Sequence, residues 1–313
     1  ALIWKEANKR FDEYGNDKVI GTNGFYAMKA HWSEHPERDE SWAEQERSRI
    51  GEERFRREHE CEFLIYDETL ISSIHLADME GTAPVETTGQ VRWYKRPTPG
   101  HTYMVSLDPA MGTGGDYAAI QVFELPTFEQ VAEWQHNTTP MNHQIRILQQ
   151  INKHINDAIM EKDSSASPQI FYSMENNTIG EAALMRVMDI GEENIPGMFL
   201  SEPIRKGHRR KFRRGFNTTA KFKIDACTKF KELIESGKMK LNSQLLISEL
   251  KDFVASGMSY KAKAGQHDDL VSACLLMTRM MKVLADFDPK IFEKWTDRTS
   301  EIKPMPVFGS FYG

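Results

Sequence analysis

Four carboxylates stand where predicted strands end or a predicted helix begins, and together they have the chemistry of a metal site. Asp108 and Glu175 each end an apolar strand, and Asp268 and Asp269 open a helix. Clustered carboxylates repel one another and are costly to bury unless a cation joins them. Oxygen ligands without a nearby Cys or paired His suit Mg²⁺ or Mn²⁺. Two such ions, about 4 Å apart, can activate water and stabilise the leaving oxygen of a phosphodiester.

A glycine-rich loop separates Asp108 from a fifth carboxylate, Asp116, in the stretch 105-VSLDPAMGTGGDYAAIQVF-123. A glycine loop after a strand is typical of a phosphate cradle, but it also fits a plain turn that needs positive φ. Here we expect the glycines to let the chain turn tightly and the carboxylates to carry the chemistry.

The other acidic positions also have structural explanations when taken singly. Glu175 could be a member of a buried ion pair, and the asparagines at 176–177 could cap the next helix. Asp268 and Asp269 could be first-turn acids that the helix dipole favours. We expect His267 to cap the helix or support a ligand rather than to bind metal. The combination, in this order along the chain, favours the metal site.

The elements that must position these residues begin after residue 100, where the pattern becomes regular. Apolar alternation and helical periodicity predict strands over 102–108, 117–123, 130–137, 169–175 and 197–202, and helices over 142–160, 178–188, 218–236, 243–254 and 267–286. Strands first, then alternating helix and strand, indicate an α/β domain with a mixed sheet flanked by helices. In such a sheet, strand ends that face the same way gather their side chains in one crevice.

The first 90 residues predict a mostly helical linker segment that precedes the sheet. Residues 33–62 carry many charges of both signs, with Ser41 and Glu44 as an expected capping box. Residues 78–100 are rich in Pro and Gly, which places a domain boundary near residue 90. We therefore predict a globular α/β domain over 91–287 and a flexible tail over 288–313.

Composition excludes several broad classes. The net charge is −6, so any surface that binds nucleic acid must be local. Three widely spaced cysteines without a CxxC pair argue against a zinc knuckle or a disulfide framework. No apolar run approaches the roughly 18 residues of a membrane span, and no signal peptide is visible. The start at Ala1, inside an apparent element, suggests a piece of a longer protein.

The chain resembles the nuclease domain of the large terminase subunit of tailed bacteriophages, the DNA-packaging motor, with the tail end of its ATPase half. The matching pieces are 105-VSLDPAMGTGGDYAAIQVF-123, 172-YSMENN-177, 217-NTTAKFKIDACTKFKELIESGKMKL-241 and 265-GQHDDLVSACLL-276. The resemblance implies an RNase H-like fold related to Holliday-junction resolvases. It also implies Mg²⁺- or Mn²⁺-dependent cleavage of double-stranded concatemeric viral DNA during genome packaging, with two ions expected.

The resemblance assigns catalysis to Asp108, Glu175 and Asp269, and metal binding to these three together with Asp268 and Asp116. Many relatives carry another acid three residues after the aspartate pair, where this chain has Ser272. Adjacent helix residues point about 100° apart, so Asp268 and Asp269 cannot both face one metal equally. We favour Asp269.

The resemblance also implies partners: double-stranded DNA, the portal protein, the small terminase subunit and an N-terminal ATPase domain of the same protein, without a membrane. It places the protein in the host cytoplasm, at the portal vertex of the procapsid during packaging. The sequence holds no GxxxxGK[ST] motif, so we expect no ATPase activity from this chain alone.

Three other classes of protein fit part of the pattern. An actin-like or sugar-kinase-like ATPase would need a second glycine-rich phosphate turn, and asparagines at 176–177 stand after Glu175 instead. A catalytically silent DNA-binding or motor-docking module would not need all three carboxylate positions filled. A cellular junction resolvase is disfavoured by the long helical N-terminal segment.

A basic strip, 205-RKGHRRKFRRG-215, is the remaining candidate for function. It contains no acid and lies between the strand after Glu175 and the next helix, so it could flank the carboxylates. A solvated loop, or one that pairs with acids elsewhere, is the plain alternative. An acidic site repels phosphate, so we predict that the strip holds DNA. Its cations are Arg205, Lys206, Arg209, Arg210, Lys211, Arg213 and Arg214.

Overall fold

The computed structural model describes residues 20–21, 24–26, 28, 31–60, 68–202 and 214–287 of the chain. The chain divides into two compact units, one of residues 1–67 and 73–78 and the other of residues 68–72 and 79–313. The domain limits predicted at residues 90 and 287 remain predictions, and the predicted tail over 288–313 lies outside the described residues.

The smaller unit is helical where it is described. It contains η1 (Trp32–Glu34), α2 (Glu40–Ile50), α3 (Glu52–Glu58) and α4 (Ser73–Asp78). Trp32, Ala43 and Phe55 are buried together as its small core. The expected cap was wrong by two residues: the Asp39 side chain accepts a hydrogen bond of 2.8 Å from the Trp42 amide, ahead of Ser41. Aspartate is as good a cap as serine, so the helix begins earlier than a serine cap would allow.

The larger unit is built on a mixed sheet. Its strands are β1 (Glu86–Thr88), β2 (Val91–Trp93), β3 (Thr102–Asp108), β4 (Ala118–Leu125), β5 (Glu129–His136), β6 (Gln169–Met174) and β7 (Met198–Phe199). In the described ranges their order is β1-β2-β5-β4-β3-β6-β7. Along this order, every neighbouring pair from β1 through β2, β5 and β4 to β3 is antiparallel. Strand β6 lies parallel to both β3 and β7. The predicted mixed sheet, with strands first and then alternating helix and strand, is confirmed.

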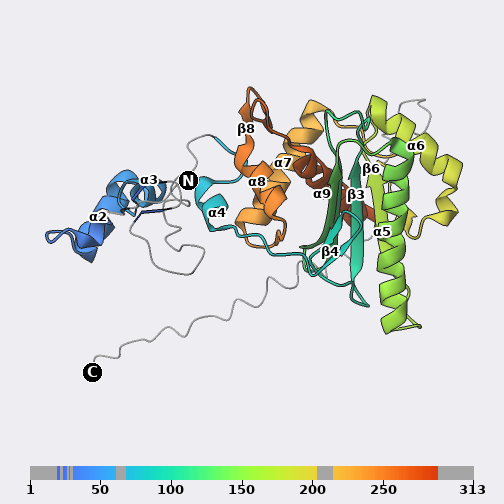
Figure 1. Cartoon of the computed structure of the whole chain (residues 1–313), viewed down its shortest axis with the longest axis horizontal. Helices are drawn as coiled ribbons and strands as arrows, with labels where there is room; N and C mark the ends of the chain where they lie inside the picture. The colour runs from blue at the N-terminus through green and yellow to red at the C-terminus, as the bar shows by residue number, and fades with distance from the viewer. Residues whose placement is uncertain are drawn as a thin grey trace. The chain divides into compact units, whose positions relative to one another are not determined.

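Helices cover both faces of this sheet. They are α5 (Met141–Lys162), α6 (Thr178–Ile190), α7 (Ala220–Glu235), α8 (Gln244–Asp252) and α9 (Asp269–Phe287), with the short η2 (Glu192–Asn194) after α6. Figure 1 shows α5 and α6 on one side of the sheet and α7, α8 and α9 on the other. One core lies between the sheet and α5–α6, where the apolar stripe of α5 packs, and α7, α8 and α9 bury further apolar side chains on the other face.

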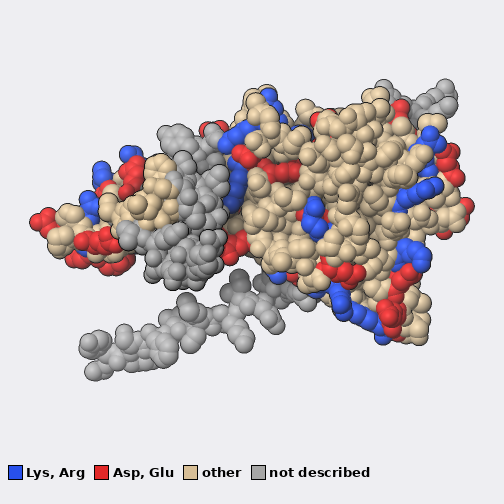
Figure 2. Space-filling view, in the orientation of Figure 1, with Lys and Arg blue, Asp and Glu red and all other residues tan. Residues whose placement is uncertain are grey.

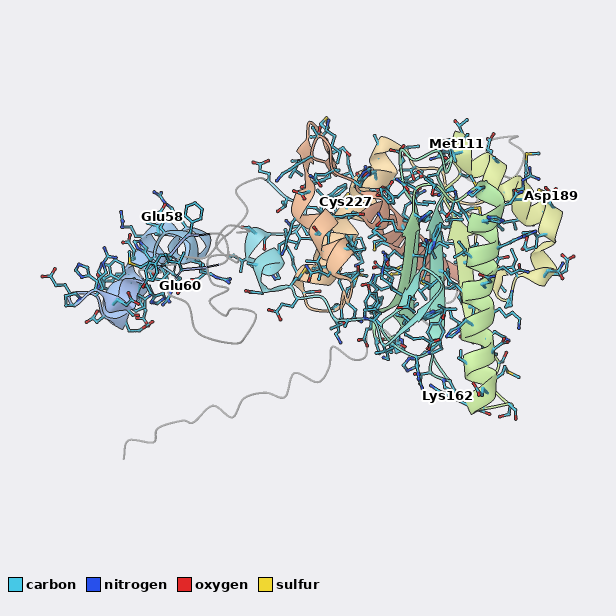
Figure 3. All side chains as sticks on the ribbon, viewed as in Figure 1. Glu58, Glu60, Met111, Lys162, Asp189 and Cys227 are labelled. Atoms are coloured by element: carbon cyan, nitrogen blue, oxygen red, sulfur yellow. The ribbon has the colours of Figure 1, made fainter. Side chains whose placement is uncertain are left out.

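The two ends of the sheet differ in what they carry. Figure 3 places Met111, in the loop after β3, at the end opposite Lys162 at the close of α5. The carboxyl ends of β3 and β6 therefore lie at the Met111 end.

Cys227 on α7 and Cys274 are free and buried, as expected for reduced thiols.

Two features of the larger unit were not predicted. The helix expected over 243–254 ends at Asp252, because Phe253 begins β8 (Phe253–Ser256), which pairs with β9 (Ser259–Ala262) as a hairpin. The turn-rich segment over residues 78–100 also holds β1 and β2. All four unpredicted strands are short, and their apolar pattern is weak beside the signal of the neighbouring turn residues.

Candidate active site

The strand register places Asp108 beside Glu175. In the parallel pair of β3 and β6, Leu107 lies opposite Met174, so the next residues of both strands meet where the strands end. The Glu175 amide donates to the Leu107 carbonyl at 3.1 Å, and the Asp108 and Glu175 carboxyls lie close together. Burial, and then the charge of Glu175, raise the pKa of Asp108 well above its ordinary value. A cation bound beside the two carboxyls would offset their repulsion.

Glu175 is held by the backbone of Phe216 and by Asn177, which the sequence suggested as a helix cap. Its backbone bridges Phe216 on the side away from β3, and Asn177 Nδ2 donates to Glu175 Oε2 at 3.2 Å. Asn177 also caps α6, since its Oδ1 accepts from the Gly180 amide at 2.9 Å. A Cβ on Gly180 would lie only 1.8 Å from the Glu175 carbonyl oxygen. Glycine is needed there because the first turn of α6 packs directly on the backbone of Glu175.

A pocket of about 200 Å³ opens over this carboxyl pair. Its walls come from β3, from the segment after β6, and from α7 and α9. Asp108, Glu175, Thr218, Lys223, Ala226, Ser272, Leu275, Leu276 and Arg279 line it. Ser272, where many relatives carry an acid, thus faces the pocket. The pocket combines two carboxylates with two cations, which is a suitable setting for a phosphodiester that bridges metal and protein.

Asp268 and Asp269 have different surroundings. The backbone of Tyr117 lies close to the Asp269 carboxyl, whose Oδ2 is buried without a hydrogen-bond partner, 3.5 Å from His267 Nδ1. Burial raises the pKa of Asp269 to about 6. Asp268 Oδ2 instead accepts from the Ala262 amide at 3.3 Å and lies 3.8 Å from Lys223 Nζ. The aspartates therefore face different neighbours.

The glycine loop brings Asp116 toward Asp269. Gly112 has φ of 72°, and a Cβ there would lie 2.3 Å from the Thr139 carbonyl oxygen, so this position requires glycine. Asp116 is exposed, and its charge adds to the raised pKa of Asp269. His267 packs edge-on against the Tyr117 ring, with centroids 4.8 Å apart, and its Nδ1 lies 3.5 Å from Asp269 Oδ2.

The predicted carboxylates are thus brought together in two groups. Asp108 and Glu175 meet in the pocket, while Asp269 and Asp116 lie on its β4 side, near enough that Asp269 and Asp268 act electrostatically on Asp108. Across the described ranges, no three Asp, Glu, His or Cys side chains already converge as a metal site.

Most of the basic strip, including six of its seven cations, lies outside the described residues. Arg214 is described: it pairs with Glu192 Oε2 at 2.7 Å and lies 6.0 Å from the centre of the Phe199 ring. This one member follows the plain alternative of pairing with an acid.

Comparison with known proteins decides the family. The model of the family described as "Terminase RNaseH-like domain" matches residues 105–280, more than half of the chain. The chain belongs to this family. The match runs from β3 to α9 and includes the strand ends that carry Asp108 and Glu175.

Solved structures agree with the terminase nuclease fold. The large terminase nuclease of thermophilic phage G20c with bound magnesium has a TM-score of 0.50 and 17% identity, over 68% of this chain and 97% of that one. Its cobalt-bound form gives the same values. The human cytomegalovirus terminase nuclease domain, manganese-soaked and inhibitor-bound, has a TM-score of 0.47 and 15% identity, over 70% and 97% of the two chains.

The terminase family and fold settle the class of function. The chain is a terminase nuclease domain with an endonuclease role in genome packaging, and the actin-like ATPase alternative is not favoured. Every helix in the described part of the chain is too short or too polar to span a bilayer.

Proposed function

We propose that this terminase nuclease cuts double-stranded concatemeric viral DNA with Mg²⁺ or Mn²⁺ at the pocket of Asp108 and Glu175. The observation that carries the proposal is the pair of adjacent carboxyls at the ends of two parallel strands, inside a pocket that also holds Lys223 and Arg279. Two half-buried acids side by side repel each other unless their site binds a cation.

The residues fit a hard divalent cation. Asp108, Glu175 and Asp269 would hold it, with Asp116 and Asp268 close enough to contribute charge. All donors are carboxylate oxygens, and Asp269 Oδ2 is buried without a hydrogen-bond partner. The G20c nuclease binds magnesium and cobalt, which supports a divalent ion here. Two ions, if bound, would supply an activated water and stabilise the leaving oxygen.

The protein's own groups prepare the site for this chemistry. Burial and the nearby charge of Glu175 raise the pKa of Asp108, so Asp108 must lose its proton before it can act as a ligand, and metal binding is coupled to proton release. Strands β3 and β6 fix the two backbones, and Gly180 with Asn177 fixes Glu175 from the helix side. This positions the carboxylates on rigid elements before the substrate arrives.

The wider assignments follow from the family resemblance. We infer that the ATPase domain of the same protein precedes this chain, and that the chain alone hydrolyses no ATP because it has no P-loop sequence. Double-stranded DNA, the portal protein and the small terminase subunit are the inferred partners. The inferred place of action is the host cytoplasm, at the portal vertex of the procapsid.

The test is cleavage of supercoiled plasmid with Mg²⁺ or Mn²⁺, compared with EDTA. We expect Asp108→Asn and Glu175→Gln each to lower the cleavage rate by about 10³-fold or more, because each removes a metal ligand worth several kcal/mol in the transition state. In EDTA their melting temperatures should equal or exceed the wild-type value, because the carboxylate repulsion is relieved.

Asp189→Asn is the matched control, since Asp189 is an exposed acid of α6 paired with Arg186 at 2.7 Å. It should cleave like the wild type. Near-normal cleavage by the Asp108 or Glu175 variant would reject the assignment of the site.

A further inference from the structure

The two cations of the pocket are held very differently. Arg279 is fixed: it donates to Thr218 Oγ1 at 3.1 Å and to the Asn217 carbonyl at 3.0 Å, and it pairs with Glu202. Its guanidinium carbon also lies 5.3 Å and 4.9 Å from the ring centres of Phe216 and Phe222. Arg279 therefore joins α9 to the segment before α7, and three of its five N–H donors are occupied.

Lys223 is held loosely. Its Nζ lies 3.8 Å from Asp268 Oδ2, beyond hydrogen-bond distance, and 5.4 Å from the centre of the Phe253 ring. The side chain is 25% exposed and lines the pocket with Asp108 and Glu175. A lysine ammonium has three donors on a flexible stem, so Lys223 can turn toward a ligand in the pocket.

We propose that Lys223 binds a non-bridging oxygen of the DNA phosphate at the cut site, and that Asp268 is a positioning residue for Lys223 rather than a metal ligand. The proposal rests on the proposed function and deepens it. A phosphate placed over Asp108 and Glu175 meets negative charge, which a cation in the same pocket offsets.

Asp268 is suited to this positioning role by its own contacts. The Ala262 amide of the hairpin fixes Asp268 Oδ2 on the side of Lys223, whereas Asp269 turns toward Tyr117 on the other side. The adjacent aspartates then have different roles. Asp269 is a ligand of the metal, and Asp268 keeps the ammonium of Lys223 at the pocket wall. This explains how two neighbouring acids can both serve one site although they point about 100° apart.

The experiment compares Lys223→Met, Lys223→Arg and the control Lys229→Met in the whole chain. Lys229 is an exposed lysine of the same helix, paired with Glu232 at 3.0 Å. We expect Lys223→Met to lower kcat/KM for plasmid cleavage by about 10- to 100-fold, the usual cost of losing one hydrogen bond to a charged group. Lys223→Arg should recover most of this loss, and Lys229→Met should match the wild type.

Binding is measured separately in the Asp108→Asn background, with a short DNA duplex in EDTA. Adding Lys223→Met should reduce the slope of log affinity against log salt by about one unit, which is the effect of removing one phosphate contact. Adding Lys223→Arg should keep the slope. The melting temperature and the Mn²⁺ affinity of Lys223→Met, measured by calorimetry in an otherwise wild-type chain, should not fall.

Asp268→Asn and Asp269→Asn test the division of tasks by calorimetry with Mn²⁺. Asp269→Asn should weaken Mn²⁺ binding at least about tenfold, and Asp268→Asn should keep it while lowering kcat/KM. Equal loss of Mn²⁺ binding in both variants overturns the role given to Asp268.

If Lys223→Met keeps the wild-type kcat/KM and salt slope, the role given to Lys223 is overturned. It is also overturned if this variant loses stability and Mn²⁺ binding, because the lysine would then be purely structural. An active Asp108→Asn variant, by contrast, contradicts the proposed function itself. The two failures are therefore distinguishable.

Discussion

At the scale of single residues, the site depends on how tightly Glu175 is held. The Leu107 carbonyl, the backbone of Phe216 and the first turn of α6 surround it. None of these contacts involves a charged group. Catalytic geometry here is set by backbone packing, and a single added methyl group is enough to disturb it.

We predict that Gly180→Ala lowers both stability and cleavage. In an ordinary helix, alanine in place of glycine stabilises by about 1 kcal/mol. Here the new Cβ would lie 1.8 Å from the Glu175 carbonyl oxygen, so the helix or Glu175 must move. We expect about 1–3 kcal/mol of destabilisation, and a cleavage rate about 10- to 100-fold lower. Thermal melting and plasmid cleavage measure the two effects.

Gly115→Ala is the control for this substitution. A Cβ on Gly115 meets no atom within 4 Å, and this glycine has no positive φ. It should keep wild-type stability. A Gly180→Ala protein that is more stable than the wild type and fully active would show that Glu175 does not depend on this contact.

At the scale of elements, three of them meet behind the aspartates. Glu249 of α8 accepts hydrogen bonds from Gln135 of β5 at 2.8 Å and from the Val271 amide in the first turn of α9 at 3.2 Å. It therefore holds the start of the helix that carries Asp269. Burial raises the pKa of Glu249 to about 8, and the nearby charge of Asp269 adds to this.

This raised pKa predicts how stability changes with pH. A carboxyl whose pKa is higher in the folded state stabilises fully below its unfolded pKa, and loses that contribution as pH rises through the folded pKa. The window for Glu249 runs from about 4.5 to about 8. In EDTA, the melting temperature of the wild type should fall as the pH rises through this window. The free energy of unfolding of Glu249→Gln should fall less over this window than that of the wild type. The difference should be at most a few kcal/mol, since a shift of one pKa unit corresponds to about 1.4 kcal/mol.

The pKa of Asp269, about 6, and the raised pKa of Asp108 act in the same direction, so part of the fall should remain in Glu249→Gln. Glu232→Gln, at an exposed acid of α7, is the control and should follow the wild-type curve. Identical curves for the wild type and Glu249→Gln would contradict the prediction.

At the scale of the whole molecule, an acidic chain must bind an acidic polymer. The net charge is −6, and Figure 2 shows Lys and Arg interspersed with Asp and Glu over the visible face of the larger unit. Most described cations are also paired with acids, as Lys95 and Lys240 are with Glu129. The strip over 205–215 is the densest run of positive charge in the sequence, and it contains no acid.

We predict that the strip contributes much of the affinity for DNA. The variant replaces five of its cations by alanine, and these are Arg209, Arg210, Lys211, Arg213 and Arg214. Affinity should fall alike for all DNA sequences, and the salt slope should drop by about one unit for each phosphate that loses its cation. Cleavage should fall mainly through KM and recover at high DNA concentration. Fluorescence anisotropy at several salt concentrations measures the slope.

The control for the strip variant removes three surface cations that have acidic partners, Lys153, Arg186 and Lys229. Unchanged affinity and slope in the strip variant would indicate that these cations dock a motor partner instead of DNA.

The sequence by itself determined the local elements and the class of chemistry. Strand β3 matches its predicted range at both ends, and the amphipathic stripe of α5 set that helix to within two residues. Local signals of this kind depend on neighbours a few residues apart, which the sequence displays directly. The family motifs likewise lie in short contiguous stretches, so the amino-acid sequence alone indicates the endonuclease role.

Only the tertiary structure decided which residues meet. The register of β3 against β6 puts Asp108 beside Glu175, although 67 residues separate them. Packing of α9 against its neighbours turns Asp269 toward Tyr117 and Asp268 toward Lys223. No periodicity distinguishes two adjacent acids on one helix, because their separation of about 100° has meaning only once the surrounding elements are in place.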